Sequence, residues 1–456
     1  MRAGVAEKLA TMSPDEQALL RPLVATSRSY YVVLVILGAI TAWGLHAYYL
    51  QMRYGLGRTG LNRPEYWGIY IIDFVFFIGI SHAGTLISAI LRVSQAEWRR
   101  AITRSAELIT VLVLGFGAIQ PIVDLGRPDR LLNVLFHPHL RSPLLWDVMS
   151  IGLYFTACTI YLYVPLLPDL ALIRDSEIKA PRLYRILAAG YRDTPAQRAR
   201  LERVIGWLAI AVIPIAVSVH TIIGWIFAMT LRPMWHSTIF GPYFVVGAIY
   251  SGIAAILVAM VIIRRAFGLQ QYFRDIHFDY LGRLLLLFSL LWLYFTFAEH
   301  LTAFYGAEPD EMRTFWSKLT GAFAWPFWLM VTFCFVIPFL LMIWRGARTP
   351  LGTLLASVPV IIGMWLERFT IVVPTSVNPR WELAGVGQYL PSWIEVSIMV
   401  ATFSGFIMLY MIATKFIPIV SIWEMKEGRE HSVQDVAERV TGYLPEAVGF
   451  SPAEPG

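Results

Sequence analysis

Proton-accepting side chains crowd one stretch of this chain, DLGRPDRLLNVLFHPHLRSPLLWD, which runs from Asp124 to Asp147 between two long apolar segments. A membrane protein rarely keeps so many ionisable groups there without a chemical use. Carboxylates and imidazoles beside an aromatic ring suit a quinol, whose hydroxyls need hydrogen-bonding partners that take protons as electrons leave. The residues that could line such a pocket are Asp124, Arg127, His137, His139, Trp146 and Asp147.

Further polar side chains lie deeper in the neighbouring apolar segments. With a rise of about 1.5 Å per residue, Asp147 lies roughly 5 Å below the outer boundary, Asp73 about 10 Å and His220 about 16 Å, with His82 deeper still. We interpret Asp147, Asp73, His220 and His82 as a descending ladder of proton-accepting groups within one helix block, open at the top beneath His137 and His139. Each could instead be a buried polar group that bonds a neighbouring helix.

A second constellation joins Glu299 and His300 to Glu367 and Arg368, which lie in two other apolar segments. These four residues could form a proton path. Alternatively, a Glu–Arg pair between helices would neutralise two costly charges without any transport role. Glu395 is expected near the surface, in contact with solvent.

The composition requires that these groups be held by membrane-spanning helices. Apolar residues make up 57% of the 456 residues and charged residues 15%, and the mean hydropathy is +0.60. A bilayer is crossed by about 20 apolar residues. Ten such runs place both termini on one side: 30–52, 66–91, 105–124, 144–167, 204–231, 241–263, 284–305, 322–344, 351–374 and 391–420.

Lys and Arg predict the orientation, because cytoplasmic loops are enriched in them. Of the 37 Lys and Arg residues, 26 lie in the tails, in the loops after even-numbered helices and, as Lys415, near the end of the last run. Both termini are therefore expected in the cytoplasm of a bacterium, with the inner membrane as the location and Asp124 to Asp147 facing the periplasm. The net charge of +6 is explained by these loops against anionic lipid, so no nucleic-acid partner is implied.

The expected fold is an all-α polytopic membrane protein with two four-helix bundles, helices two to five and six to nine, plus two flanking helices. Weak likeness between the starts of these blocks suits a parallel internal repeat. The expected divisions are a cytoplasmic N-terminal tail (1–29), a first flanking helix with a periplasmic loop (30–65), a first four-helix bundle with the quinol site (66–231), a second bundle with the proton path (232–374), and a last helix with a cytoplasmic C-terminal tail (375–456).

The cysteine and histidine content argues against a metal centre or haem held by this chain. Cys158 and Cys334 are the two cysteines, whereas an iron–sulfur cluster is normally held by four thiolates. No expected helix carries two intramembrane histidines at a di-haem spacing, and a haem between His82 and His220 is poorly supported. Electrons from a quinol would therefore pass to another subunit.

At this point the residues resemble a known family. DLGRPDR after the third helix, followed by SPLLWD at the start of the fourth, is similar to the polysulfide-reductase membrane subunits (PsrC) and their NrfD relatives, over roughly residues 64 to 374. Ten helices, the tails and HAGTLISAILR in the second helix look closest to the ActC branch, the larger membrane subunit of bacterial alternative complex III.

This resemblance implies quinol oxidation, with menaquinol as the expected substrate and with coupling to proton translocation. The implied partners are a periplasmic iron–sulfur subunit (ActB-like), a homologous membrane subunit (ActF-like) and c-type cytochrome subunits, which hold the iron–sulfur clusters and haems. It assigns the site to His139 and Asp147, with Asp73 and His82 below and Asp124 and Arg127 shaping the loop. Whether His137 or His139 faces the quinol is open.

Two other classes of function stay open at this level. Acidic residues in both blocks would also suit a proton channel or secondary transporter, which moves protons without a redox partner. A structural membrane anchor, whose polar groups only bind helices together, is the third interpretation.

Overall fold

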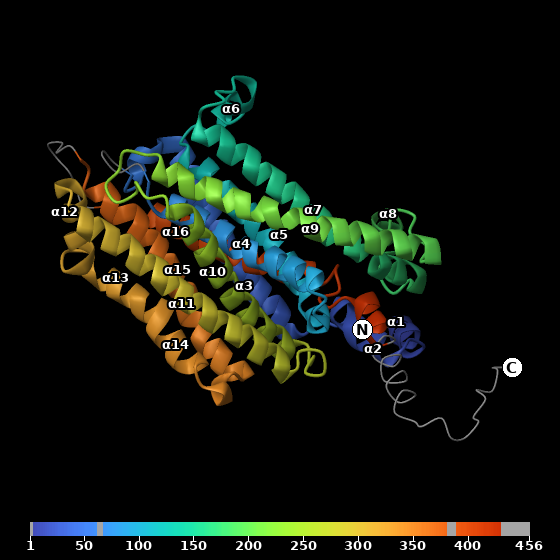
Figure 1. Ribbon diagram of the computed structural model, residues 1–456. Helices are drawn as coiled ribbons and strands as arrows, with labels where there is room; N and C mark the ends of the chain where they lie inside the picture. Colours follow the sequence, from blue (N-terminus) through green and yellow to red (C-terminus); the bar gives the residue numbers. More distant parts are fainter. Residues whose placement is uncertain (1–2, 62–66, 381–388, 430–456) are drawn as a thin grey trace.

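The computed structural model describes residues 3–61, 67–380 and 389–429, and these residues form helices joined by loops (Figure 1). Among them, ten helices are long and apolar enough to cross a membrane, which confirms the all-α polytopic class and the expected ten spans. They are α3 (Arg28–Tyr54), α4 (Ile69–Val93), α5 (Thr103–Asp124), α7 (Pro143–Ser176), α9 (Pro195–Ala228), α10 (Phe240–Ala266), α11 (Asp275–Gly306), α13 and α14 with the turn between them (Ala324–Met342), α15 (Pro350–Val377) and α16 (Trp393–Ala413).

Shorter helices mark the two ends of the bundle. Figure 1 shows α6 (Asn133–Phe136) and α12 (Pro309–Leu319) at one end, and α1 (Ala3–Ala10), α2 (Pro14–Val24) and α8 (Pro181–Leu187) at the other. We call the α6 end the outer end and the α8 end the inner end, following the orientation expected from the charges. Parts of the expected divisions, residues 1–2, 62–66, 381–388 and 430–456, lie outside the described residues.

Several helices extend beyond the expected spans at the inner end. Both α7 and α9 have 34 residues, which corresponds to about 51 Å against a hydrocarbon thickness of about 30 Å. The N-terminus of α9 is fixed by Thr194, whose hydroxyl accepts a hydrogen bond from the Gln197 amide, and by Pro195 in the first turn. The connection between the expected spans 144–167 and 204–231 therefore shrinks to residues 177–194, which include α8.

Helix α4 lies at the centre of the packing. It contacts α5, α9, α10 and α15, while α7 packs on α9 and α5, α11 packs on α10, and the α13–α14 helix packs on α15. Helices α3 and α16 form a pair that reaches the rest through α5 and α4. Because α4 touches helices of both expected bundles, the division into two four-helix blocks stays a prediction.

Glycines permit the closest helix contacts. A Cβ atom on Gly84 of α4 would lie 2.2 Å from the Thr110 hydroxyl oxygen and 2.3 Å from the Ala106 carbonyl oxygen of α5. A Cβ on Gly44 of α3 would lie 2.0 Å from the Cβ of Ala401 in α16. Side chains at these two glycines would separate the helices, so small residues set the spacing of both pairs.

Candidate functional site

Asp147 lies in the second turn of α7, at the outer end. Its side chain is buried, and one carboxylate oxygen has no hydrogen-bond partner among the described residues. The preceding Trp146 is held in place because its indole N–H donates to the Leu140 carbonyl oxygen at 2.7 Å. A buried carboxylate oxygen without a donor is costly, so a ligand hydroxyl at this position would satisfy it.

Tyr154 continues the same face of α7 toward the membrane centre, because seven residues make about two helical turns. Its ring centroid lies 4.6 Å from that of His82 in α4. The Tyr154 hydroxyl donates to the Ser81 carbonyl oxygen at 3.2 Å. Asp147 and His82 therefore belong to one interior face, with an aromatic ring between their levels.

His82 is fully buried between two backbone carbonyls. Its Nδ1 lies 2.7 Å from the Ile78 oxygen and its Nε2 lies 2.8 Å from the Ala216 oxygen of α9. A neutral imidazole can donate to only one of these oxygens, whereas a protonated ring can donate to both. If the ring were protonated, each of its nitrogens would have a carbonyl oxygen as acceptor.

His220 of α9 lies against His82, with ring centroids 4.4 Å apart in an edge-to-face arrangement. It is fully buried, and neither ring nitrogen has a hydrogen-bond partner among the described residues. The two imidazoles are in direct contact, so a haem iron between them would require both rings to move apart. Instead, the pair forms a polar centre inside α4, α7 and α9.

The Asp73 side chain projects from α4 on the opposite side from His82. Nine residues separate them, about two and a half turns, and Asp73 accepts a hydrogen bond from the indole N–H of Trp365 in α15 at 2.8 Å. Its second oxygen is buried without a partner among the described residues. The structure therefore divides the expected ladder into two neighbourhoods, one around His82 and one around Asp73.

A polar cluster surrounds the start of α4 at the outer end. The Tyr70 hydroxyl donates to Gln51 of α3, whose amide donates to the Val123 carbonyl oxygen at 2.9 Å. One Asp124 carboxylate oxygen is buried there without a partner in the described part of the chain. Glu395 is fully buried rather than solvated, and it accepts hydrogen bonds from the Gly60 amide, the Tyr389 hydroxyl and the Ser392 amide.

The loop that carries the two candidate histidines projects from the outer end with α6 (Figure 1). His137 and His139 are exposed, and neither imidazole hydrogen-bonds to a described residue. Arg127 is also exposed and forms an ion pair with Asp129 at 2.9 Å. These loop residues, which we call the rim, project beside the start of α7, while Asp147 lies inside the bundle. No hydrogen bond or ring contact among the described residues joins His137 or His139 to Asp147.

In the second block, Glu367 and Arg368 of α15 form a buried ion pair with each other. Glu367 also accepts a hydrogen bond from the Trp292 indole N–H at 2.7 Å. The Arg368 guanidinium lies over the Phe244 ring at 5.3 Å and faces Gly247, where a Cβ atom would come within 2.9 Å. The ion pair therefore forms between neighbouring residues of one helix, and the Arg368 guanidinium contacts α10.

Glu299 and His300 of α11 line a cavity of about 20 Å³ together with Lys318 of α12, which is room for about one water molecule. The His300 Nδ1 lies 2.8 Å from the Thr296 carbonyl oxygen. Lys318 is buried, and this burial, opposed by the charge of Glu299, lowers its pKa to about 8. A lysine with this pKa exchanges its proton readily near neutral pH.

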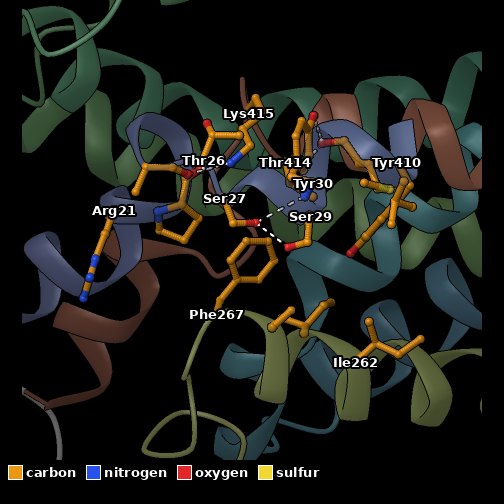
Figure 2. Close-up of a pocket in the computed structure, with 16 residues that line it drawn as sticks. Arg21, Thr26, Ser27, Ser29, Tyr30, Ile262, Phe267, Tyr410, Thr414 and Lys415 are labelled. Carbon is orange, nitrogen blue, oxygen red and sulfur yellow. Dashed lines mark hydrogen bonds between the residues drawn. The ribbon is translucent and has the colours of Figure 1, made fainter. Parts of the chain in front are cut away.

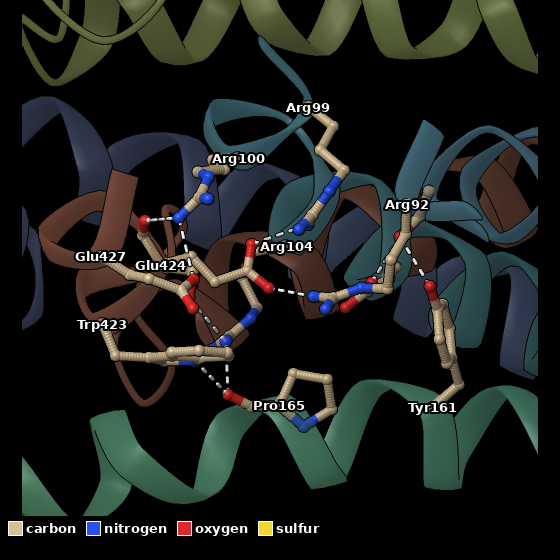
Figure 3. A network of polar contacts seen from close by, with 12 residues as sticks. Arg92, Arg99, Arg100, Arg104, Tyr161, Pro165, Trp423, Glu424 and Glu427 are labelled. Carbon is tan, nitrogen blue, oxygen red and sulfur yellow. Dashed lines mark hydrogen bonds and ion pairs between the residues drawn. The ribbon is translucent and has the colours of Figure 1, made fainter. Parts of the chain in front are cut away.

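An ion network closes the inner end (Figure 3). Glu424, in the helical segment 422–429, forms ion pairs with Arg92 and Arg99, while Arg104 pairs with Asp169 of α7 at 3.1 Å. Burial alone would raise the pKa of Glu424, but the surrounding arginines bring it below its usual value. The C-terminal segment is thereby fastened over the first block.

Hydroxyl groups connect this network with the centre of the bundle. On α4, Thr85 contacts the Cys158 sulfur at 3.4 Å, and one turn further Ser88 donates to Glu107 at 2.6 Å. The Tyr161 hydroxyl lies 3.2 Å from Ser88. Polar groups therefore follow α4 from His82 to the inner end.

The sequence interpretation missed Lys318, Glu107 and the burial of Glu395. Lys318 falls in the loop between the expected spans 284–305 and 322–344, although α12 carries an acidic first turn, Asp310 and Glu311, typical of a helix start. Glu395 stands three residues after Ser392, a capping-box spacing that ties both side chains to the start of α16. Both signals were present in the sequence, but burial depends on partners that sequence alone does not identify.

Comparison with known proteins gives a family match over most of the chain. Residues 57–379 match the family described as Polysulphide reductase, NrfD. A putative membrane subunit of dimethyl sulfoxide reductase from Halobacterium salinarum is 30% identical over 259 residues, which cover 56% of this chain and 57% of that protein. The chain thus spans little more than half the length of this relative.

Two further relatives carry names that refer to redox complexes. A selenate reductase subunit from Mesobacillus selenatarsenatis is 26% identical over 86% of this chain and 94% of its own length. The Hdr-like menaquinol oxidoreductase integral membrane subunit from Archaeoglobus fulgidus is 25% identical over 51% of this chain and 50% of its own length.

Proposed function

Because this chain belongs to the Polysulphide reductase, NrfD family, we propose that it is the quinol-binding and quinol-oxidising membrane subunit of an electron-transfer complex. The observation that carries the proposal is the buried carboxylate oxygen of Asp147, which lacks a hydrogen-bond partner among the described residues and lies above the His82–His220 pair. A quinol hydroxyl supplies the missing donor.

The chemistry requires acceptors for two protons as the quinol becomes a quinone and loses two electrons. Asp147 accepts the first hydroxyl proton. We propose that the second moves toward His82, where the Ile78 and Ala216 carbonyl oxygens can both accept hydrogen bonds from the protonated ring. His139 or His137, on the rim, holds the other end of the quinol ring. The electrons leave through a partner subunit.

The name of the archaeal relative includes menaquinol, and this supports menaquinol as the substrate. We propose an assembly of the alternative complex III type, with an ActB-like periplasmic iron–sulfur subunit, an ActF-like membrane subunit and c-type cytochromes. The outer end then faces the periplasm of a bacterial cell and both termini lie in the cytoplasm. Excess Lys and Arg at the inner end support this orientation.

Site variants in the purified complex test the quinol site. Asp147→Asn and His139→Ala are each expected to lower menaquinol-dependent reduction of the partner haems by about 10²-fold or more, because removal of a proton acceptor typically costs this much. The matched control is Asp310→Asn, at the outer end but in α12, which should retain normal turnover. The amount of each partner protein in every preparation separates lost chemistry from lost assembly.

Normal turnover in both Asp147→Asn and His139→Ala would overturn the quinol-oxidation proposal. Loss of partner subunits in Asp147→Asn, with normal turnover of the residual complex, would instead support a structural anchor.

We extend the proposal to a proton path through Glu299, His300, Glu367 and Arg368, with Lys318 as a further member. The small cavity shared by Glu299, His300 and Lys318 supports it. In liposomes holding the complex, Glu299→Gln should leave quinol oxidation near normal and abolish the proton movement coupled to it. Proton uptake by this chain alone, without a redox partner, would favour a channel or transporter.

A further inference from the structure

A cleft of about 810 Å³ opens at the inner end, where the start of α3, the end of α10 and the end of α16 meet (Figure 2). This cleft is at the opposite end of the bundle from Asp147 and the loop that carries His137 and His139. Its lining divides into a polar rim and an apolar wall. The rim includes Arg21, Thr26, Ser27, Ser29 and Lys415, and the wall includes Val33, Ile262, Ala266, Phe267 and Met411.

The rim carries positive charge that no described carboxylate balances. The Lys415 ammonium donates to the Pro22 and Ala25 carbonyl oxygens, each at 2.8 Å, and Lys179 donates to the Leu23 carbonyl oxygen nearby. Arg21 is exposed. Burial and the neighbouring Lys179 lower the pKa of Lys415, so a bound anion would stabilise both cations.

Hydroxyl and amide groups add hydrogen-bonding capacity beside these cations. Ser27 and Ser29 are exposed, and their hydroxyl oxygens lie 2.8 Å apart. Ser27 caps the N-terminus of α3 by accepting a hydrogen bond from the Tyr30 amide. The first turn of a helix favours an anion, and here it stands in the same rim as Lys415 (Figure 2).

The wall below the rim is open to the membrane. Val33 is 42% exposed and Ile262 is 58% exposed, although both lie on spanning helices. In Figure 2, Tyr410 extends from α16 toward the helix that carries Ile262. The Tyr410 hydroxyl is buried and has no hydrogen-bond partner among the described residues, so the cleft offers a donor to an ester or phosphate oxygen.

We propose that this cleft binds an anionic phospholipid, with its headgroup phosphate on Arg21, Ser29 and Lys415 and an acyl chain along Val33, Ile262 and Ala266. A quinone head is uncharged and would leave the cations unbalanced. A free phosphate would leave the apolar wall without a partner. The combination of a cationic hydroxyl rim and an apolar wall matches an amphiphilic anion.

Retention of phosphatidylglycerol tests the proposal. The purified complex is placed in nanodiscs of phosphatidylcholine with a minority of phosphatidylglycerol, then delipidated with detergent, and the retained phospholipid is counted by native mass spectrometry. Arg21→Glu and Ala266→Trp, which reverse the rim charge and fill the cleft, should each lower phosphatidylglycerol retention on the order of tenfold. Both positions are exposed, so folding should tolerate the changes.

Two matched controls lie on α9 at the inner end and along its membrane face. Arg200→Glu and Ala211→Trp change equally exposed residues outside the cleft and should retain wild-type phosphatidylglycerol. Equal retention in all five proteins would overturn the proposal, as would recovery of a quinone whose loss, without loss of phospholipid, follows Ala266→Trp. Displacement of phosphatidylglycerol by inorganic phosphate would identify a free-anion site and also overturn it.

Discussion

Asp73 and His82 lie on opposite sides of α4, and each side chain is hydrogen-bonded to a different neighbouring helix. The Trp365 indole fixes Asp73 on the α15 side, whereas the Ala216 carbonyl oxygen fixes His82 on the α9 side. Asp73 is fully buried, so its one donor is important for the stability of the carboxyl group. The position of each proton acceptor is therefore set by a residue in another helix.

Trp365→Phe tests this dependence. Loss of the indole N–H leaves the Asp73 carboxyl group without a donor and should lower the free energy of unfolding by about 2 kcal/mol. Trp328→Phe is the control, because Trp328 is 52% exposed and its indole donates to a backbone carbonyl oxygen at the surface. Thermal unfolding in detergent measures both, and equal midpoints would contradict the prediction.

Lys318 should give the protein a pH-dependent stability above neutral pH. Burial lowers its pKa to about 8 from an ordinary value of 10.5, so the unfolded chain binds more protons than the folded one between these values. The free energy of unfolding therefore rises from pH 8 toward pH 10, and this gain is lost as the pH falls back to 8. Lys318→Met should remove this rise, measured as the unfolding midpoint against pH.

The control for this titration is Lys426→Met at the inner end, where the lysine side chain is 45% exposed. It should keep the wild-type slope between pH 8 and pH 10. An unchanged slope in Lys318→Met would show that another group titrates in this range.

Contacts between helices depend on small residues at a few positions. At Gly84, a methyl group would overlap the Thr110 side chain and the Ala106 backbone, and the latter cannot rotate away. Gly84→Ala should therefore destabilise the protein by about 2 kcal/mol. Gly152→Ala, in α7, meets nothing within 4 Å and should be neutral or slightly stabilising. Thermal unfolding compares the two, and similar midpoints would contradict this packing.

The segment 422–429 is a second element whose position depends on contacts with distant residues, and among its ion pairs those of Glu424 are the most deeply buried. Glu424→Gln leaves Arg92 and Arg99 without their carboxylate and should cost about 3 kcal/mol. Glu427 pairs with Arg100, and the Glu427 side chain is 27% exposed. Glu427→Gln should therefore cost less than about 1 kcal/mol. Limited proteolysis should cut the segment faster in Glu424→Gln, and unchanged cleavage would show that other contacts hold it.

Over the whole molecule, hydropathy predicted the ten spans because a bilayer imposes one length on every crossing segment. It could not predict that α7 and α9 continue into water, since solvated turns there are stabilised by caps such as Thr194 rather than by lipid. The nine-residue spacing puts Asp73 and His82 on opposite faces of one helix, but it does not identify Trp365 and the Ala216 carbonyl oxygen as their partners. Lys318 fell in an expected loop and Glu395 near the surface in the last expected span; their burial could not be predicted, because it depends on the fold around them.

The fastening of Glu424 by Arg92 also affects the order of folding. These residues are 332 positions apart. During synthesis, Arg92 in the last turn of α4 and Arg99 just after it therefore lack their carboxylate partner until nearly the whole described chain has been made. Contacts between distant residues form slowly, because long loops must close first. The inner end of the first block is therefore expected to close last, and a chain that stalls before Glu424 would expose uncompensated arginines to cellular quality control.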